Sequence, residues 1–263
     1  MRMGFKTKID WCDSSWNPVT GCYHGCEYCY ARRIAERFNG AFGTGNLFDL
    51  KEPIRDEWKD EETGTMVYGK KEAYPFGFTP TLHRYRLEEI QKWTQPRTIF
   101  VCSMADLFGN WVPDEWIKAV FDSCEKAPQH RYLFLTKNPE RYMKLLGAGI
   151  LPHSDNFWFG STTPYKCSQF WSHLMFNTFL SIEPIMEPFT GLGEDNAFVN
   201  WIIVGAETGN RKGRVVPEKG WIMELVNSCA RTRTPIFMKE SLREIMGDDF
   251  KQEFPWQKDS TTR

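Results

Sequence analysis

The chain has 263 residues, of which 41% are hydrophobic and 25% are charged, and its formal net charge is −1. These values are typical of a globular protein with one large domain or two small ones. The near-neutral charge weighs against a general nucleic-acid-binding protein, because duplex-binding domains usually carry a basic excess. No apolar run approaches the roughly 18 residues of a membrane span, so we expect no membrane partner.

The N-terminal segment and the cysteine content together predict a cytoplasmic protein. Residues 1–10 include Arg2, Lys6 and Lys8 but lack the apolar stretch of a secretory signal. A chain of this length can build its own core without disulfides, and its eight cysteines fit a reducing compartment.

Three cysteines follow the first predicted strand, at residues 14–19. Cys22, Cys26 and Cys29 have the spacing C-x3-C-x2-C. Thiolates packed this closely favour an iron–sulfur cluster or zinc. A structural zinc site usually closes four ligands, the fourth here being His24 or a distant residue, whereas a cluster held by three cysteines leaves one iron open to a non-protein ligand.

A helix is predicted at residues 30–38, because Ala31, Ile34, Ala35 and Phe38 recur at helical spacing and would face a core. Residues 39–78, rich in glycine, aromatic and charged residues, then interrupt the regular pattern. A connection this long inside a compact domain is usually functional or flexible. We therefore predict a lid or substrate-contacting insertion, with a flexible surface loop as the alternative.

From residue 79 onward, short apolar strands alternate with amphipathic helices. The predicted strands are at residues 79–83, 98–103, 131–136, 157–161, 178–182, 201–205 and 235–238. The predicted helices are at residues 87–93, 113–124, 166–176, 217–230 and 242–254, and one more begins with Asn138 as N-cap and Pro139 as first helical residue. About eight strands in this alternation predict an α/β protein with a parallel barrel or an open doubly wound sheet.

Polar residues follow most of these strands at their carboxyl ends, where a barrel places the groups that act. The set outside the cysteine loop is Arg84, Ser103, Asp106, Lys137, Ser161, Glu183, Glu207 and Lys239. Glu207 and Lys239 are the candidates for acid–base catalysis, because they lie at strand ends rather than on a helix surface. The glycine-rich loop 207–214 has three cations that could hold a phosphate, which favours a nucleotide or nucleic-acid substrate. The alternative is that these charges only form a solvated surface loop.

The cysteine motif, with Tyr28 just before its third cysteine, resembles the signature of the radical S-adenosylmethionine (SAM) enzymes. The resemblance implies that Cys22, Cys26 and Cys29 bind a [4Fe–4S] cluster and that Tyr28 lies near the adenine of SAM. It also implies reductive cleavage of SAM to methionine and a 5′-deoxyadenosyl radical, and it favours a parallel (βα) barrel of TIM type, full or partial, with six to eight strands, as a single domain over residues 1–263.

The flanking sequence resembles a narrower group, a largely uncharacterised phage and prokaryotic family of unknown function. The residues that carry this resemblance are W-N-P-V-T-G-C at 16–22, C-E-Y-C-Y-A at 26–31, V-C-S-M-A-D-L-F at 101–108, S-I-E-P at 181–184 and V-G-A-E at 204–207. They cover most of the chain, but the family gives no substrate.

The chemistry of SAM suggests which residues would contact it. A carboxylate or hydroxyl suits its amine and ribose diol, and a cation suits its carboxylate. For the amine and diol the candidates are Asp106, Ser103, Ser161 and Glu183; for the carboxylate they are Arg84 and Lys137. No Gly-Gly-Glu segment follows the second predicted strand, so no motif places the amine contact.

We therefore expect an enzyme that cleaves SAM and abstracts hydrogen from an unknown substrate, with an electron donor such as flavodoxin or ferredoxin as partner. One alternative is a protein in which zinc shapes the cysteine loop and the strand ends bind a nucleic acid or another partner. Another is methyl or aminocarboxypropyl transfer from cluster-bound SAM.

Overall fold

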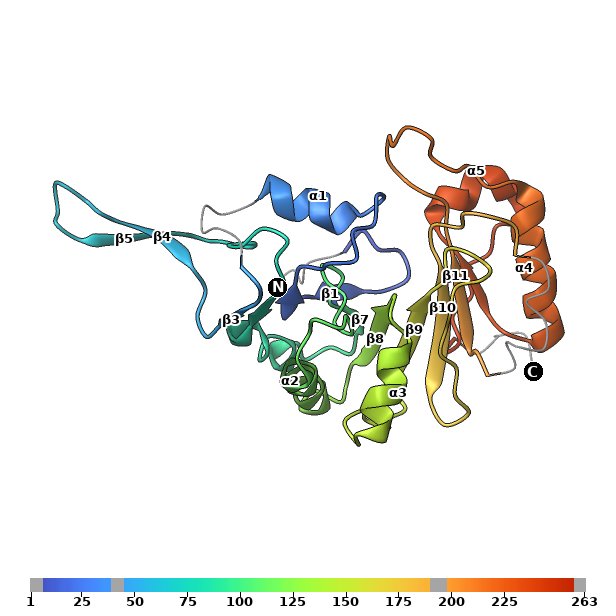
Figure 1. The fold of residues 1–263 in the computed structure, drawn as a ribbon, viewed down its shortest axis with the longest axis horizontal. Helices are drawn as coiled ribbons and strands as arrows, with labels where there is room; N and C mark the ends of the chain where they lie inside the picture. The colour runs from blue at the N-terminus through green and yellow to red at the C-terminus, as the bar shows by residue number, and fades with distance from the viewer. Residues whose placement is uncertain (1–6, 39–44, 190–197, 258–263) are drawn as a thin grey trace. The chain divides into compact units, whose positions relative to one another are not determined.

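The computed structural model describes residues 7–38, 45–189 and 198–257. The chain divides into two compact units (Figure 1). Unit 1 comprises Met1–Ser14, Arg97–Phe100 and His130–Arg263, and unit 2 comprises Ser15–Pro96 and Val101–Gln129. The chain therefore passes between the units four times.

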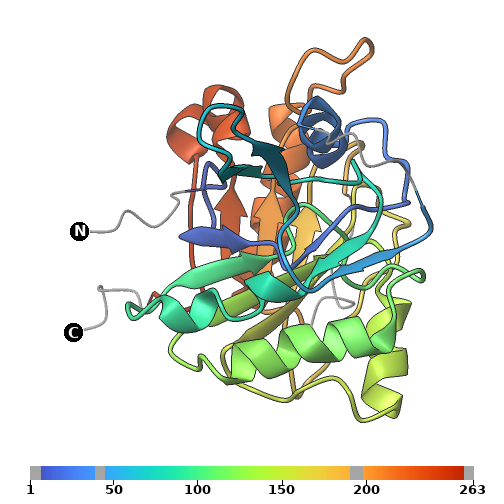
Figure 2. The ribbon, with the colours of Figure 1, turned by 90° about the vertical axis from the view of Figure 1, so that its left-hand side faces the viewer.

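A curled half-barrel sheet of seven parallel strands lies mainly in unit 1, and Figure 2 shows its curvature. Its order is β1-β7-β8-β9-β10-β11-β12. The strands are β1 (Ser14–Trp16), β7 (Thr98–Val101), β8 (Arg131–Thr136), β9 (Phe157–Thr162), β10 (Asn177–Ile182), β11 (Trp201–Val204) and β12 (Ile236–Met238). The α/β class is confirmed, and the curled sheet is compatible with a partial (βα) barrel.

The sheet is covered on both faces, as buried parallel strands require. Phe179, Trp201 and Ile203 belong to an aromatic cluster, whereas Leu180 and Ile202 belong to an aliphatic cluster. Successive side chains of a strand point to opposite faces, so the two clusters lie on opposite sides of the sheet.

Short helices accompany the strands of unit 1. They are α3 (Glu140–Gly147), α4 (Lys219–Thr232), α5 (Arg243–Met246) and the 3-10 turns η4 (Glu240–Leu242) and η5 (Gly247–Asp249). Helix α4 buries Ile222, Leu225, Val226 and Cys229, which belong to the aliphatic cluster.

Unit 2 contains a small sheet, a separate hairpin and two α-helices. The sheet has the order β2-β6-β3, with β2 (Val19–Thr20), β6 (Thr81–His83) and β3 (Phe48–Leu50). The hairpin pairs β4 (Arg55–Lys59) with β5 (Met66–Lys71). The helices are α1 (Tyr30–Arg37) and α2 (Asp114–Glu125), and the 3-10 turns are η1 (Arg84–Arg86) and η2 (Ile90–Lys92).

Two predictions between residues 79 and 93 were wrong. The segment expected as the second barrel strand forms β6, which pairs antiparallel with β2 and parallel with β3. The expected helix at 87–93 is replaced by a turn at 87–89 and the 3-10 turn η2, in which only Ile90 is buried. One buried residue does not give a short helix the apolar face that normally stabilises it.

Three helix predictions in unit 1 also need correction. Residues 166–176 form no helix, because the amide of Trp171 donates to the Ser161 hydroxyl at 3.0 Å and its ring packs against aromatic neighbours. The predicted helix at 242–254 shortens to α5 between 3-10 turns. The N-cap of α3 is Pro139 rather than Asn138.

The predicted insertion at 39–78 contains β3 and the β4–β5 hairpin, while residues 39–44 lie outside the described part of the chain. Its role as a lid stays a prediction, as does the single-domain organisation. In the described residues, no helix is long and apolar enough to cross a membrane.

Candidate functional site

The three cysteines lie on the loop that joins β2 to α1 in unit 2. Gly21 begins this loop with φ +89°, and a Cβ added there would lie 2.3 Å from the Thr79 carbonyl oxygen. The Gly21 amide donates to the Met104 carbonyl at 2.9 Å, and the Cys22 amide donates to the Phe78 carbonyl at 3.2 Å. Only glycine tolerates both this φ and this close backbone approach, so Gly21 fixes where the loop starts.

Two of the three sulfur atoms each accept a hydrogen bond from a backbone amide. The Cys22 Sγ accepts the His24 amide at 3.5 Å, and the Cys29 Sγ accepts the Arg32 amide at 3.3 Å, which makes Cys29 the N-cap of α1. The Arg32 guanidinium also donates to the Cys22 carbonyl at 3.3 Å. Burial raises the pKa of the Cys22 thiol to about 12, and the His24 amide opposes that rise.

Asp106, which lies outside the cysteine loop, contacts His24, which lies between Cys22 and Cys26. The Asp106 Oδ2 lies 2.7 Å from the His24 Nε2, and its Oδ1 accepts the Phe108 amide at 3.0 Å. Asp106 is only 5% exposed, and the His24 ring packs edge-on against Trp111 at 4.9 Å between ring centroids. Asp106 thus contacts His24 of the cysteine loop, and its predicted contact with SAM stays a prediction.

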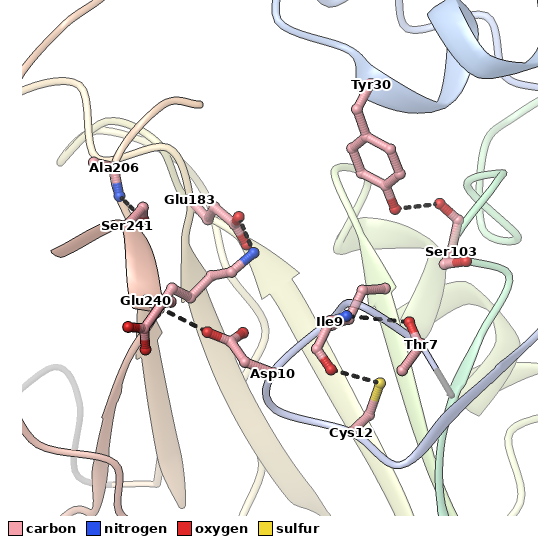
Figure 3. A network of polar contacts seen from close by, with 11 residues as sticks. Thr7, Ile9, Asp10, Cys12, Tyr30, Ser103, Glu183, Ala206, Glu240 and Ser241 are labelled. Atoms are coloured by element: carbon pink, nitrogen blue, oxygen red, sulfur yellow. Dashed lines mark hydrogen bonds and ion pairs between the residues drawn. The ribbon is translucent and has the colours of Figure 1, made fainter. Parts of the chain in front are cut away.

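The Trp-Asn-Pro motif anchors the turn that presents Asp106. The Asn17 Oδ1 accepts the Met104 amide at 2.9 Å and the Ser103 hydroxyl at 3.2 Å. The Ser103 carbonyl in turn accepts the Tyr30 hydroxyl at 2.7 Å, and Figure 3 shows Tyr30 pointing from α1 toward that carbonyl. Cys102 begins the turn with φ 60°, a conformation that non-glycine residues rarely adopt. Ser103 thus lies beside the base of α1.

Arg84 occupies a different place from the one predicted. It begins η1, directly after β6 of the small sheet, rather than ending a strand of the seven-stranded sheet. Its Nε donates to the Asp49 Oδ1 at 2.7 Å, and the ion pair with this carboxylate raises the pKa of the guanidinium. The Arg84 guanidinium is therefore bound to the Asp49 carboxylate on β3.

Glu183 and Lys239, at the carboxyl ends of β10 and β12 in unit 1, form an ion pair. The aliphatic chain of Lys239 passes over Gly205, where an added Cβ would lie 2.9 Å from the Lys239 Cδ. Nearby, the Ala206 amide donates to the Ser241 hydroxyl at 3.0 Å (Figure 3). The missing side chain at Gly205 allows a lysine on β12 to reach across β11 to a carboxylate on β10.

The remaining candidate residues of unit 1 are Glu207, Ser161 and Lys137. Glu207 is 5% exposed, and its carboxylate binds the Arg211 guanidinium through two contacts of 2.6 and 2.8 Å. This hydrogen bonding lowers the pKa of Glu207 and so favours its ionised carboxylate. The Ser161 hydroxyl is buried beneath the Trp171 amide, and Lys137 follows β8 in a half-buried position.

Three residues that position the cysteine loop were not predicted to do so from the sequence. His24 had been weighed only as a zinc ligand, and Asn17 and Arg32 had no assigned role. The sequence held a signal for Asn17, because it lies within the motif that flanks the cysteines. The pairing of His24 with Asp106 spans 82 residues, and no spacing rule reveals such a contact. The half-buried Tyr28 lies within the loop, next to Cys29.

The fit of a cluster to this loop rests on the chemistry and contacts of the three cysteines. Within the described ranges, no three or more His, Cys, Asp or Glu side chains are arranged to hold one metal ion. In a [4Fe–4S] cluster each cysteine binds a different iron, so its ligand sulfurs do not converge on one atom. All three cysteines are half-buried free thiols, and hydrogen bonds to sulfur are a known means of tuning such clusters. The donor set therefore fits the group.

Comparison with known proteins gives one match. A family model described as "Protein of unknown function (DUF5131)" matches residues 6–244. Searches of the curated proteins and of the solved structures returned no match. Because the matched segment spans far more than half of the 263 residues, the chain belongs to the DUF5131 family.

Proposed function

We propose that the protein is a radical SAM enzyme whose [4Fe–4S] cluster is bound by Cys22, Cys26 and Cys29. When bound, the cluster supplies the electron that splits SAM into methionine and the 5′-deoxyadenosyl radical, which abstracts hydrogen from the substrate. The substrate is unidentified, with a nucleotide or nucleic acid as the favoured class. A flavodoxin or ferredoxin supplies the electron, and the reaction takes place in the cytoplasm.

The observation that carries the proposal is the way the chain holds its three-cysteine loop. Backbone amides reach the Cys22 and Cys29 sulfurs, and the buried Asp106 fixes His24 between Cys22 and Cys26. An amide that donates to sulfur favours the thiolate, the form that binds iron, and so offsets part of the cost of burial. The three cysteines leave one cluster position for the amino and carboxylate groups of SAM.

The other candidate residues keep their proposed roles. Ser103, Ser161, Glu183 and Asp106 suit the amine and ribose of SAM, Tyr28 suits its adenine, and Arg84 and Lys137 suit its carboxylate. The Asp106 contact requires an oxygen lone pair beyond those that bind His24 and Phe108, and the Arg84 contact requires a guanidinium N–H beyond those that bind Asp49. Glu207 and Lys239 are proposed to handle protons of the substrate.

The test is anaerobic reconstitution of the full chain with iron and sulfide, followed by dithionite and SAM and by chromatography for 5′-deoxyadenosine. We expect about four irons and four sulfides per chain and 5′-deoxyadenosine formation that disappears in Cys26→Ala. Cys167→Ala is the matched control, because Cys167 is exposed and outside the loop; it should leave the product unchanged.

Other results separate the alternatives. An intact cluster that never yields 5′-deoxyadenosine, but transfers a methyl or aminocarboxypropyl group, contradicts hydrogen abstraction. One zinc per chain with no sulfide after anaerobic purification and reconstitution favours the zinc-stabilised binding protein instead.

A further inference from the structure

Helix α1 exposes an apolar face that its sequence had been expected to bury. Tyr30, Ile34 and Phe38 are 46%, 39% and 58% exposed, while Ala31 and Ala35 supply the buried side of the helix. Residues four apart on a helix are neighbours, so the three large side chains form one stripe. A cluster of exposed apolar residues on a protein surface commonly marks a binding site for another molecule.

Arginines flank this stripe and give it a charge. Arg33 and Arg37 are exposed on the same side of α1, and the Arg37 guanidinium lies 5.8 Å from the centre of the Phe38 ring. The segment Tyr30–Arg37 contains three arginines and one glutamate, and that glutamate, Glu36, lies 4.0 Å from Arg32. The exposed face is therefore apolar and cationic, which complements an acidic protein surface.

The same helix is joined directly to the cysteine loop. Cys29 is its N-cap, and the Arg32 guanidinium donates to the Cys22 carbonyl. A helix of eight residues is about 12 Å long, so a protein seated on the stripe lies within that length of the proposed cluster ligands. Figure 1 shows α1 at the surface of unit 2.

We propose that the face formed by Tyr30, Arg33, Ile34, Arg37 and Phe38 is the docking site of an acidic one-electron carrier protein of the flavodoxin or ferredoxin class. This inference rests on the proposed function and adds the place where the electron enters. The carrier is oxidised by one electron and the cluster is reduced by one; no proton moves and no covalent bond forms between the proteins. Small reductants such as dithionite bypass the face.

The experiment measures the affinity of the reconstituted chain for a purified acidic flavodoxin, together with 5′-deoxyadenosine formation driven either by reduced flavodoxin or by dithionite. The test variants are Arg33→Glu/Arg37→Glu and Ile34→Ser/Phe38→Ser. The control is Lys144→Glu/Arg231→Glu, which makes the same charge change at exposed positions of α3 and α4.

We expect both test variants to bind flavodoxin at least tenfold more weakly than the wild type and to lose the flavodoxin-driven rate in proportion. Their dithionite-driven rate should stay within twofold, and added salt should weaken wild-type binding, because screening reduces the attraction between exposed charges. The control variant should behave as the wild type in each measurement.

The docking site is overturned if flavodoxin does not bind the wild type or if the test variants bind it as tightly as the wild type does. It is also overturned if the control variant loses as much affinity as the test variants. A dithionite-driven rate that falls as much as the flavodoxin-driven rate in the test variants overturns it too. Sedimentation showing a dimer that Ile34→Ser/Phe38→Ser dissociates assigns the face to a second copy and also overturns it. Failure of the proposed function is distinct, because the wild type then forms no 5′-deoxyadenosine with dithionite, whereas the binding measurement still decides the docking site.

Discussion

At the scale of single residues, Asp106 shows how a buried charge organises the cysteine loop. Its two oxygens contact His24 and the Phe108 amide, and it is almost wholly shielded from water. Removing one partner of a buried hydrogen bond leaves the other with an unmet desolvation cost. Asp106 is thus a positioning residue for Cys22 and Cys26, whichever group they bind.

Asp106→Ala should lower the free energy of unfolding by about 1.5–3 kcal/mol, the usual loss for a hydrogen bond to a charged group. It should also lower the iron bound after reconstitution, since the loop loses its anchor. Urea unfolding and iron analysis measure these effects. The control is Asp122→Ala, which removes an exposed pair with Lys118 and should cost about 0.5 kcal/mol or less. Equal effects of both variants would contradict the anchoring role.

His83 is a second buried polar residue with a measurable consequence. It is fully buried, its Nε2 lies 2.9 Å from the Thr20 hydroxyl, and its Nδ1 lies 3.0 Å from the Tyr85 hydroxyl. Burial, aided by the charge of Arg86, lowers the pKa of His83 to about 2 from its usual 6.5. The folded protein therefore keeps the ring neutral, while the unfolded chain takes up a proton below that usual value.

This difference makes stability depend on pH with a definite sign. The contribution of His83 is complete above the unfolded pKa and is lost as the pH falls below it, because only the unfolded state binds the extra proton. Between pH 7.5 and pH 5, the wild type should lose up to about 2 kcal/mol relative to His83→Gln. Urea unfolding of both proteins at the two pH values checks this; a difference that does not change with pH would show that His83 does not stay neutral.

At the scale of elements, the sequence predicts best where the local pattern and the packing agree. The predicted bounds of β8 match the structure, and α2 (Asp114–Glu125) lies where a helix was predicted at 113–124. The predicted helices at 166–176 and 242–254 failed where distant contacts decide the backbone, as between Trp171 and Ser161.

The same contrast holds for the candidate site. The spacing of Cys22, Cys26 and Cys29 was visible in the sequence, because the three cysteines lie within eight residues of one loop. The partners of the other candidates were not: Arg84 binds Asp49 across 35 residues, and Lys239 binds Glu183 across 56. Ion pairs of this kind follow from topology, which the strand pattern alone left open.

Gly160 offers a test at the element scale, because it is paired with Phe179 on the neighbouring strand β10. A Cβ at Gly160 would lie 2.3 Å from an atom of the Phe179 ring. Gly160→Ala should therefore destabilise the protein by about 1–3 kcal/mol through overpacking. Gly220→Ala is the matched control, since the same change in open space on α4 should stabilise by about 0.4–1 kcal/mol. Thermal unfolding distinguishes the two signs; stabilisation by both changes would contradict the packing described here.

At the scale of the whole molecule, each unit is assembled from separated segments of chain. Trp11 illustrates this in unit 1: it is 2% exposed and its ring centroid lies 4.6 Å from that of Phe100. It shares the aromatic cluster with Phe179 and Trp201, which lie far along the chain. Unit 1 therefore needs its N-terminal segment to complete its core.

Trp11→Ala should lower the free energy of unfolding by about 3–5 kcal/mol, the usual loss for a buried tryptophan. A fragment of residues 130–263 lacks both Trp11 and Phe100 and should show no cooperative unfolding. Trp58→Ala, at a position 52% exposed on the hairpin, is the control and should cost less than about 1 kcal/mol. Cooperative unfolding of the fragment, followed by circular dichroism, would show instead that the later segment folds alone.

The eight cysteines differ in exposure, so their reactivity toward an alkylating reagent can be used to measure whether the cysteine loop is occupied. Cys102, Cys124 and Cys229 are buried, and burial raises the pKa values of Cys102 and Cys229 to about 12. Since the thiolate is the form that alkylating reagents attack, these side chains stay unlabelled while the fold persists. Exposed Cys167 reacts in every sample and serves as an internal standard. If Cys26 and Cys29 bind the proposed cluster, their labelling ratio to Cys167, read by peptide mass spectrometry, gives the fraction of molecules that carry it.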